Sequence, residues 1–374
     1  MKVLALVTAL YDTSPGQRFR IEQWARYLER DGFEFTFVPF ADRRLDEVLY
    51  LPGRQMEKAS LMLAALGRRL STVIKAGRFD AVFLYREASL VGPAFIERLL
   101  AARRVPLIYD FDDPIWLSYK SPSNGFFSKL KCPKKTISIC RLANHVITGN
   151  RLLAEWASQH NSQVTVIPST IDLDQYPARP ESSSQNDTMT LGWTGSHSTL
   201  PFLDLIIDAL NELAQTHPFR VVVVAHTEDI HIPAAKFEVV GRKWTAEREA
   251  TDLYDVDIGL GPFPDSGWTP WRCHGKVLQY MALGIPCVVS RLGILPDYIN
   301  DGHNGMLAGD ANEWVAKLKR LIDDVTLRRT LGRAGRQTIE ERYSANVWAP
   351  KFGEILRSAV DAARRPSRRV MQTT

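Results

Sequence analysis

The chain has 374 residues, of which 45% are hydrophobic and 24% are charged, and its formal net charge is +5. This length exceeds one ordinary hydrophobic core and indicates two domains of a globular protein. No apolar run reaches the roughly 20 residues of a membrane span. The four cysteines form no CxxC pair and no zinc-ligand spacing, so we expect reduced thiols and no metal site.

Short apolar runs alternate with amphipathic stretches along the first half, which is typical of a parallel sheet with crossover helices. Strands are predicted at residues 3–10, 33–40, 81–87, 105–111, 145–150 and 163–169. Helices are predicted at residues 18–32, 54–76, 94–104, 134–143 and 151–160. The opening run is read as a strand rather than a signal peptide, because no cleavage site follows it. These elements predict a doubly wound domain over residues 1–177.

A second alternation follows the polar stretch "ARPESSSQNDTM", residues 178–189, which we interpret as a linker. It predicts another doubly wound domain over residues 190–345. The segment 346–363 is helical in pattern. Residues 364–374 are rich in arginine and are read as a basic, flexible tail. No nucleic-acid partner is expected, because no recognition motif accompanies this charge.

Two loops between strands and helices carry the strongest chemical signals of the second domain. "LGWTGS" places Gly195 and Ser196 before a predicted helix, where backbone N–H groups can approach an anion. In "KVLQYMALGIPCVVS", Lys276 and Gln279 share one face of a helix, with the lysine at its positive end and Arg272 just upstream. The pattern indicates an anion site. The alternatives are a tight turn and a surface lysine.

Several stretches together resemble glycosyltransferase family 4, the retaining enzymes of the GT-B fold. In the second half these are "LGWTGS", "DVDIGLGPFPDSGW", "KVLQYMALGIPCVVSRLG" and "INDGHNGMLAGDANEWVAKLKRLIDD"; in the first half they are "RFRIEQWARYLERDG", "LIYDFDDPIW" and "VIPSTIDLDQY". The resemblance implies an α/β chain with two Rossmann-like domains facing a cleft. It also implies that the 346–363 helix crosses back to the first domain.

That resemblance implies a nucleoside-diphosphate sugar as co-substrate and no required cofactor. Gly195 and Ser196 match the phosphate-facing turn, and Lys276 matches a lysine that binds the diphosphate. Gln279 stands in place of the glutamate that usually binds the ribose. Trp244 falls at the nucleobase loop, although it could equally be a core aromatic residue.

The chain departs from the family pattern at its paired glutamates, whose positions are occupied by Trp271 and Gln279. A glutamine can still accept a hydrogen bond from one ribose hydroxyl. The basic pair that commonly follows the glycine turn is also missing. Lys276 and Arg272 are then expected to carry more of the phosphate charge.

Acceptor-side residues are expected in the first domain. "DFDD" supplies Asp112 and Asp113, which we assign as candidate catalytic carboxylates. The alternative is a turn with a helix cap. Lys276 of the second domain is the third candidate catalytic residue. Gly16 and Arg18, in "SPGQRFR", start a helix near the presumed cleft and are candidate residues for binding the nucleotide-sugar co-substrate.

The arginines of that helix also have a plainer interpretation. Arg18 and Arg20 could form surface ion pairs with Glu22 instead of facing phosphate or acceptor. Only the arrangement of the side chains distinguishes the two.

The predicted activity is transfer of a sugar with retention to a glycan, a lipid-linked acceptor or a small molecule. The alternatives are a nucleotide-sugar-binding protein with weak catalysis and an epimerase acting on the free nucleotide sugar. We expect a cytoplasmic protein. Peripheral contact with an anionic membrane is an open alternative for the segments 54–78 and 126–135, which are basic and amphipathic or aromatic.

Overall fold

The computed structural model describes residues 1–365 except 50, 52, 118–130, 181–187 and 197. Two compact units share the chain: unit 1 comprises Met1–Pro168 with Trp348–Thr374, and unit 2 comprises Ser169–Val347. The division between them falls before the stretch 178–189, most of which lies outside the described residues. The tail 366–374 and the aromatic part of 126–135 lie outside them as well.

Unit 1 contains a six-stranded parallel sheet in the order β2-β1-β3-β4-β5-β6. Its strands are β1 (Lys2–Val7), β2 (Glu34–Pro39), β3 (Ala81–Tyr85), β4 (Leu107–Phe111), β5 (His145–Thr148) and β6 (Val164–Val166). Residues of β3 and β4 are buried throughout, as expected for strands covered on both faces. The strand order reverses between β1 and β3, and such sheets bind ligands beyond the carboxyl ends at this point.

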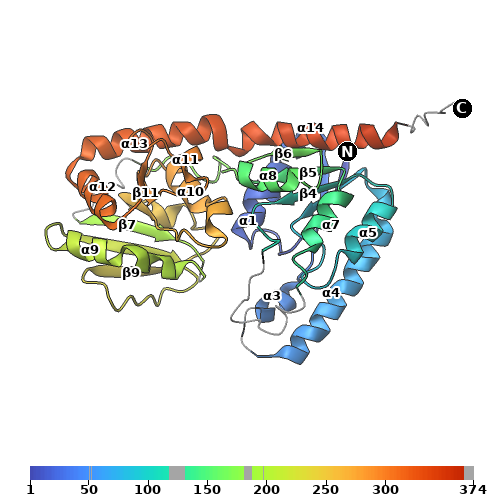
Figure 1. Cartoon of the computed structure of the whole chain (residues 1–374), viewed down its shortest axis with the longest axis horizontal. Coiled ribbons are helices and arrows are strands. Elements are labelled where there is room, and N and C mark those ends of the chain that lie inside the picture. The colour runs from blue at the N-terminus through green and yellow to red at the C-terminus, as the bar shows by residue number, and fades with distance from the viewer. Residues whose placement is uncertain (50, 52, 118–130, 181–187, 197, 366–374) are drawn as a thin grey trace, which may run out of the picture. The chain divides into compact units, whose positions relative to one another are not determined.

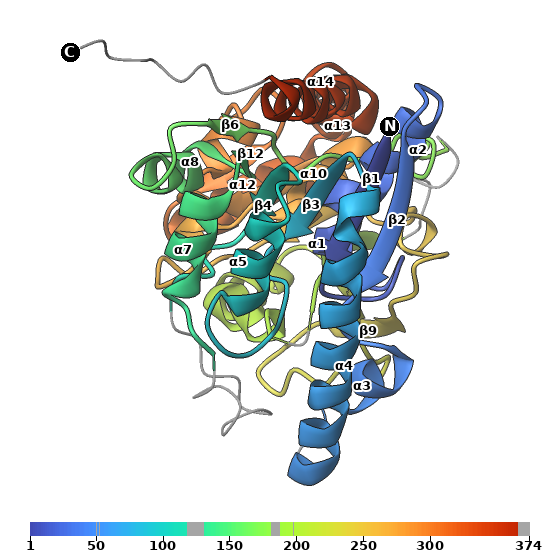
Figure 2. The same cartoon turned by 90° about the vertical axis from the view of Figure 1, so that its right-hand side faces the viewer.

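Helices cover the unit 1 sheet. They are α1 (Pro15–Gln17), α2 (Gln23–Glu29), α3 (Arg43–Leu49), α4 (Gln55–Lys75), α5 (Phe95–Ala102), α7 (Lys135–Leu142) and α8 (Arg151–Ser158). In Figure 2, α4, α5 and α7 lie side by side in front of the strands. Figures 1 and 2 both show α4 reaching well beyond the end of α5. The predicted helix over 18–32 is interrupted by a π-helical turn, Arg18–Glu22.

Unit 2 contains the second six-stranded parallel sheet, in the order β12-β11-β10-β7-β8-β9. Its strands are β7 (Met189–Thr194), β8 (Phe219–Ala225), β9 (Glu238–Lys243), β10 (Ile258–Gly261), β11 (Cys287–Ser290) and β12 (Met306–Ala308). This is the dinucleotide-binding order 3-2-1-4-5-6, with its reversal between β7 and β10. A ligand of this unit is therefore expected beyond those two strands.

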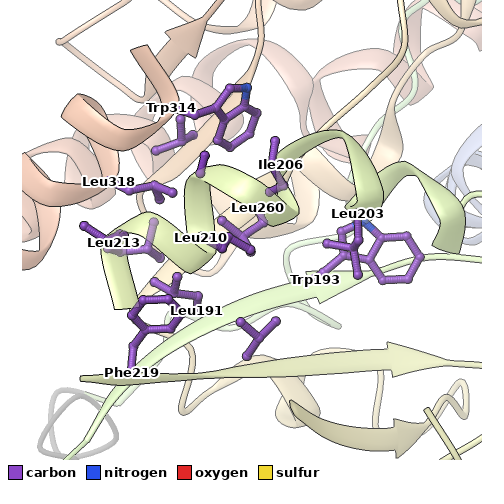
Figure 3. Close-up of a cluster of buried hydrophobic side chains, with 14 of the residues drawn as sticks. Leu191, Trp193, Leu203, Ile206, Leu210, Leu213, Phe219, Leu260, Trp314 and Leu318 are labelled. Atoms are coloured by element: carbon purple, nitrogen blue, oxygen red, sulfur yellow. The ribbon is translucent and has the colours of Figure 1, made fainter. Parts of the chain in front are cut away.

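Helices also pack on the sheet of unit 2. They are α9 (Ile207–Ala214), α10 (Gly275–Ala282), α11 (Leu295–Tyr298), α12 (Ala311–Asp323) and α13 (Val325–Thr338). Figure 3 shows Leu210 and Leu213 of α9 above Leu191 and Phe219, with Trp314 of α12 on the far side of the helix. This apolar cluster holds in place the strands beyond whose carboxyl ends a ligand is expected.

The last helix, α14 (Ala345–Arg364), contributes to the core of unit 1. Phe352 is fully buried, and its ring centroid lies 5.2 Å from that of Trp24 and 5.3 Å from that of Phe83. Leu356 of the same helix is also buried, whereas Trp348 and Ile355 are only half-buried.

Candidate functional site

Lys276 lies at the strand reversal of unit 2. It occupies the first turn of α10, and its Nζ atom lies 3.9 Å from the ring centroid of Trp193 in β7. The same atom lies 5.5 Å from the ring centroid of Phe263, just after β10. Two aromatic rings therefore flank the ammonium group, one in β7 and one just after β10. Figure 3 shows the Trp193 ring at the edge of the apolar core.

The ammonium of Lys276 has no hydrogen-bond partner among the described residues. Part of the residue is exposed, but the Nζ atom itself is enclosed. Burial lowers the pKa of Lys276 well below its usual value, and the charge of Arg272 lowers it further. An enclosed ammonium without an anion is costly. The attraction of the aromatic faces offsets only part of that cost.

The predicted glycine turn lies against the same indole. A side chain at Gly195 would place its Cβ 2.6 Å from the Trp193 ring and 2.8 Å from Thr199 Oγ1, so only glycine fits there. Gly195 N donates to Val224 O, and Ser196 O accepts from Thr199 N. The chain continues as a 3₁₀ helix, Leu200–Ile206, rather than directly as an α-helix. The structure thus joins Gly195 and Lys276 through Trp193.

Gln279 and Trp244 belong to one buried network. Gln279 Nε2 donates to Tyr176 Oη over 2.7 Å, and Tyr176 Oη donates to Glu249 Oε2 over 2.5 Å. The other carboxylate oxygen of Glu249 accepts from Trp244 Nε1 over 3.1 Å. Trp244 is half-buried and follows β9 directly. Trp271 is half-buried, in a short 3₁₀ turn before Arg272.

The candidate residues of unit 1 meet at its own strand reversal. Asp112 Oδ1 accepts from Tyr85 Oη over 3.0 Å and from Arg86 Nε over 2.8 Å. Arg86 also donates to Asp113 Oδ2 over 2.7 Å. A Cβ at Gly16 would lie 2.7 Å from Tyr85 Oη and 3.2 Å from Asp112 Oδ2. Gly16 therefore packs against this cluster, in which both carboxylates face an arginine.

The arginines after Gly16 are buried and pair with residues other than Glu22. Arg18 Nε lies 2.8 Å from Asp12 Oδ1. Arg20 forms a fully buried, two-pronged pair with Asp110 at the end of β4. Glu22 instead accepts from Gln17 Nε2 and from the backbone of Asp12. The alternative interpretation, surface pairs with Glu22, is therefore wrong.

Several residues of these clusters were not identified from the sequence, among them Trp193, Phe263, Tyr176, Glu249, Tyr85 and Arg86. The position of Trp193 beside the glycine turn was the one available signal, since side chains two apart on a strand point to the same face. Tyr176 ends the stretch "VIPSTIDLDQY", whose resemblance assigned no role to this residue, and Glu249 lies in a stretch without a recognisable pattern. In the parts of the chain that the structure describes, no three His, Cys, Asp or Glu side chains converge as metal ligands.

The second half of the chain matches a known family. The model of the family described as "Glycosyl transferases group 1" matches residues 189–324, which include the glycine turn and α10. Among curated proteins, sulfoquinovosyl transferase SQD2 of Arabidopsis thaliana is 34% identical over 90 residues. The alignment covers 19% of this chain and 18% of that protein, so the chain spans about a fifth of the relative's length.

Solved structures resemble the chain over nearly its whole length. Sucrose-phosphate synthase from Thermosynechococcus elongatus aligns with a TM-score of 0.66 at 15% identity, over 97% of this chain and 100% of that one. HepE from Anabaena, solved with UDP, aligns with a TM-score of 0.65 at 18% identity, over 96% and 100% of the two chains. With its two parallel six-stranded α/β sheets, the chain has the GT-B fold of glycosyltransferase structures.

Proposed function

We propose that the chain is a glycosyltransferase of the family 4 type, which moves a sugar from a nucleoside-diphosphate sugar to an acceptor. The observation that carries this proposal is the Lys276 ammonium, which is enclosed at the strand reversal of unit 2 and has no hydrogen-bond partner among the described residues. A diphosphate would supply the missing partner. The match to group 1 glycosyl transferases and the UDP bound in HepE support the same ligand class.

The chemistry needs positive groups at the leaving diphosphate. Breaking the bond between the anomeric carbon and the diphosphate develops negative charge, which Lys276 and the backbone N–H group of Ser196 would stabilise. The N–H of Gly195 already donates to Val224 O, so Gly195 would serve only by leaving room for the diphosphate. Arg272 adds a second positive charge near Lys276. Retention follows if the leaving phosphate takes the proton of an acceptor that attacks from the same face. No cofactor is required for this step.

Nucleoside recognition is assigned to the network around Trp244 and Gln279. The indole of Trp244 would contact the base, and the amide of Gln279 would contact the ribose. The acceptor is assigned to unit 1, where Gly16 and Arg18 lie at the start of the first helix. Asp112 and Asp113 would orient an acceptor hydroxyl from there. The acceptor class is a glycan, a lipid-linked sugar or a small molecule.

Calorimetric titration tests the donor site. UDP, GDP and ADP, and the monophosphates UMP, GMP and AMP, are titrated into wild type and Lys276→Ala. Charge-assisted contacts contribute about 1.5–3 kcal/mol, so the diphosphate that binds best should lose roughly ten- to a hundredfold in affinity. Its monophosphate should lose less. Equal affinities in both proteins would overturn the assignment.

Product analysis separates transfer from its alternatives. The nucleotide sugars of the best-binding base are incubated with and without a panel of acceptors. Transfer predicts donor consumption that depends on an acceptor. A changed sugar nucleotide without acceptor would instead identify an epimerase. Tight donor binding without turnover would identify a binding protein.

Peripheral contact with an anionic bilayer is assigned to the outer face of α4. Met56, Leu63 and Ile74 are 89%, 70% and 69% exposed, and they lie along one side of this 21-residue helix. Its single acidic residue, Glu57, pairs with Arg44 and Arg54. Such a face suits insertion among anionic headgroups. None of the described helices is both long and apolar enough to cross a membrane.

Vesicle flotation tests that face. Wild type should float with phosphatidylglycerol vesicles at low salt, and Leu63→Glu combined with Ile74→Glu should remain at the bottom. The matched control is Leu205→Glu, since Leu205 is 54% exposed in unit 2. Equal behaviour of all three proteins would remove the proposal. The proposal would also be removed if wild type were a dimer in solution and the double variant a monomer. That result would show that this face is a contact between two copies of the chain.

A further inference from the structure

The buried chain of hydrogen bonds from Gln279 to Glu249 defines which way the Gln279 amide points. Gln279, Tyr176 and Glu249 are 5%, 1% and 4% exposed, so water has little access to them. Tyr176 comes from the segment before β7, and Glu249 follows β9. Their contact with α10 therefore joins three regions that are distant in the sequence.

The proton count along this chain permits one arrangement. Glu249, as a carboxylate, only accepts hydrogen bonds, and Trp244 Nε1 only donates. The single proton of the Tyr176 hydroxyl is committed to Glu249. The Tyr176 oxygen can then only accept, so the group of Gln279 that faces it must be its NH₂. The carbonyl oxygen of Gln279 consequently faces away from Tyr176.

We propose that Glu249 and Tyr176 are positioning residues, which hold the Gln279 carbonyl oxygen as a fixed acceptor for a ribose hydroxyl of the donor. The inference rests on the proposed nucleotide site. Among the described residues, no donor contacts this oxygen. Gln279 lies one helical turn from Lys276, so a diphosphate on the lysine brings the adjoining ribose to the same face of α10.

The same logic explains why a glutamine works at this position in this chain. A glutamate at 279 would direct a second acceptor-only carboxylate at Tyr176, whose single proton already serves Glu249. Two buried carboxylates would then compete for one hydroxyl. In effect, the carboxylate of the network lies at Glu249 and the amide at Gln279.

Discrimination between ribose and deoxyribose tests the proposal. The diphosphate among UDP, GDP and ADP that binds best is compared with its 2′-deoxy and 3′-deoxy forms. A neutral hydrogen bond predicts that wild type prefers the ribose form by roughly threefold to tenfold over one of them. Tyr176→Phe and Glu249→Gln should bring this ratio close to one, because the amide can then turn over.

Tyr298→Phe is the matched control. Tyr298 is also buried in unit 2, and its hydroxyl bonds the carbonyl of Cys273, without contact to Gln279. This variant should keep the wild-type ratio. An unchanged ratio in Tyr176→Phe and Glu249→Gln overturns the inference while the donor site stands. If no nucleoside diphosphate binds wild type, the proposed function fails with it.

Exchanging the amide of Gln279 and the carboxylate of Glu249 gives a second, independent test of their coupling through Tyr176. Gln279→Glu alone should lower the melting temperature of the ligand-free protein. The double variant Gln279→Glu with Glu249→Gln should recover most of that loss, because one carboxylate again faces one hydroxyl. Additive effects of the two substitutions would show that Tyr176 does not couple the positions.

Discussion

Lys276 illustrates how one residue can oppose stability and serve binding. Its ammonium is held against Trp193 and enclosed, yet the described residues offer it no anion. Enclosing an unpaired charge raises the free energy of the folded state relative to the unfolded state. Natural proteins tolerate such a group where a ligand supplies its partner.

Replacing Lys276 with methionine should stabilise the ligand-free protein. The methionine keeps the apolar contact with Trp193 and removes the buried charge, so the free energy of unfolding should rise by at least about 1 kcal/mol. The diphosphate should no longer raise the melting temperature. Thermal unfolding with and without UDP, GDP or ADP measures both effects.

The matched control is Lys351→Met. Lys351 Nζ also lies over an indole, 4.2 Å from the Trp348 ring centroid, but on an exposed lysine. Its replacement should change the melting temperature little. A Lys276→Met protein that melts below wild type would contradict the proposed strain at this site.

The pH dependence of stability provides a second prediction for Lys276. Its pKa is lowered in the folded state, so at low pH the folded protein bears the full penalty of the buried charge. The penalty disappears as pH rises toward about 10, where the unfolded lysine also loses its proton. The stability advantage of Lys276→Met should therefore shrink with rising pH. Urea unfolding of both proteins across this range measures the difference, and a constant advantage would refute the assigned cause.

The sequence predicted part of this site for sound physical reasons. The position of Lys276 on the helix and the small residues at Gly195 and Ser196 are local features, and both indicate an anion site. The reason for Gly195 was only partly foreseen, because contact with the Trp193 ring, rather than approach of a ligand alone, excludes a side chain. Glu249 could not be foreseen, since its role depends on contacts with distant segments.

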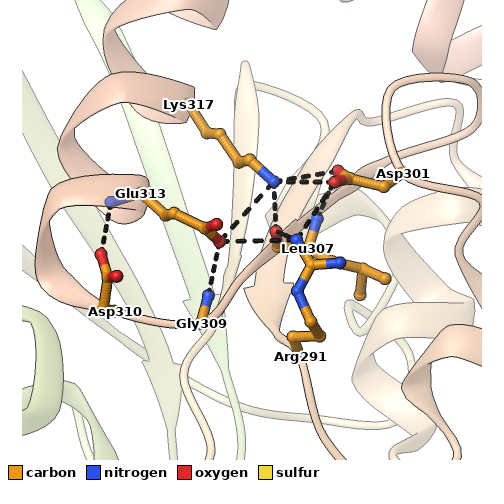
Figure 4. Close-up of polar contacts among 7 residues, drawn as sticks. All are labelled: Arg291, Asp301, Leu307, Gly309, Asp310, Glu313 and Lys317. Atoms are coloured by element: carbon orange, nitrogen blue, oxygen red, sulfur yellow. Dashed lines mark hydrogen bonds and ion pairs between the residues drawn. The ribbon is translucent and has the colours of Figure 1, made fainter.

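Among the elements, α12 shows how local signals set the limits of a helix. Asp310 Oδ1 accepts from Glu313 N over 2.9 Å, and Glu313 Oε2 accepts from Gly309 N over 2.8 Å. Figure 4 shows this cap beside the ion pairs that Asp301 forms with Arg291 and Lys317. The reciprocal arrangement satisfies backbone N–H groups that the first turn leaves unpaired.

Removal of this cap gives a prediction at the scale of the helix. Asp310→Ala should lower the free energy of unfolding of unit 2 by about 0.5–2 kcal/mol, the usual loss for a missing N-cap. Urea denaturation measures it as a lower midpoint. Glu212→Ala, on the exposed side of α9, is the control and should change the midpoint little. Equal midpoints for Asp310→Ala and wild type would show that water replaces the cap without loss.

The hydrophobic periodicity predicted which segments are helices and strands, but not the irregular turns within them. The helix predicted over 54–76 is α4, and the strands predicted in the first half are the strands of the unit 1 sheet. The π-helical turn at Arg18–Glu22 was not predicted. Burial of Arg20 against Asp110 accompanies it, and this pairing joins residues far apart in the sequence. Local pattern therefore identified the elements, whereas long-range pairing set their irregularities.

At the scale of the whole molecule, unit 1 is built from both ends of the chain. Its sheet comes from Met1–Pro168, and Phe352 of α14 fills the space beside Trp24 and Phe83. The contribution of α14 to this core is therefore large for a single helix. Deleting a buried phenylalanine side chain typically costs about 3–5 kcal/mol.

Truncation before Trp348 should therefore destabilise unit 1 much more than unit 2. Limited proteolysis followed by mass spectrometry should find cleavage within 1–168 at protease concentrations that leave full-length protein intact. Phe352→Ala should show the same preference more weakly, and Trp348→Ala, at a half-buried position, should resemble wild type. Cleavage first within 169–347 would contradict this account.

The divided origin of unit 1 has a consequence during synthesis on the ribosome. Residues 169–347 leave the exit tunnel before α14 does, so unit 2 can fold while unit 1 still lacks Phe352. Until then the nascent chain exposes Trp24 and Phe83, an aromatic surface of the kind that chaperones bind and that promotes aggregation. The domain translated first is thus the domain completed last.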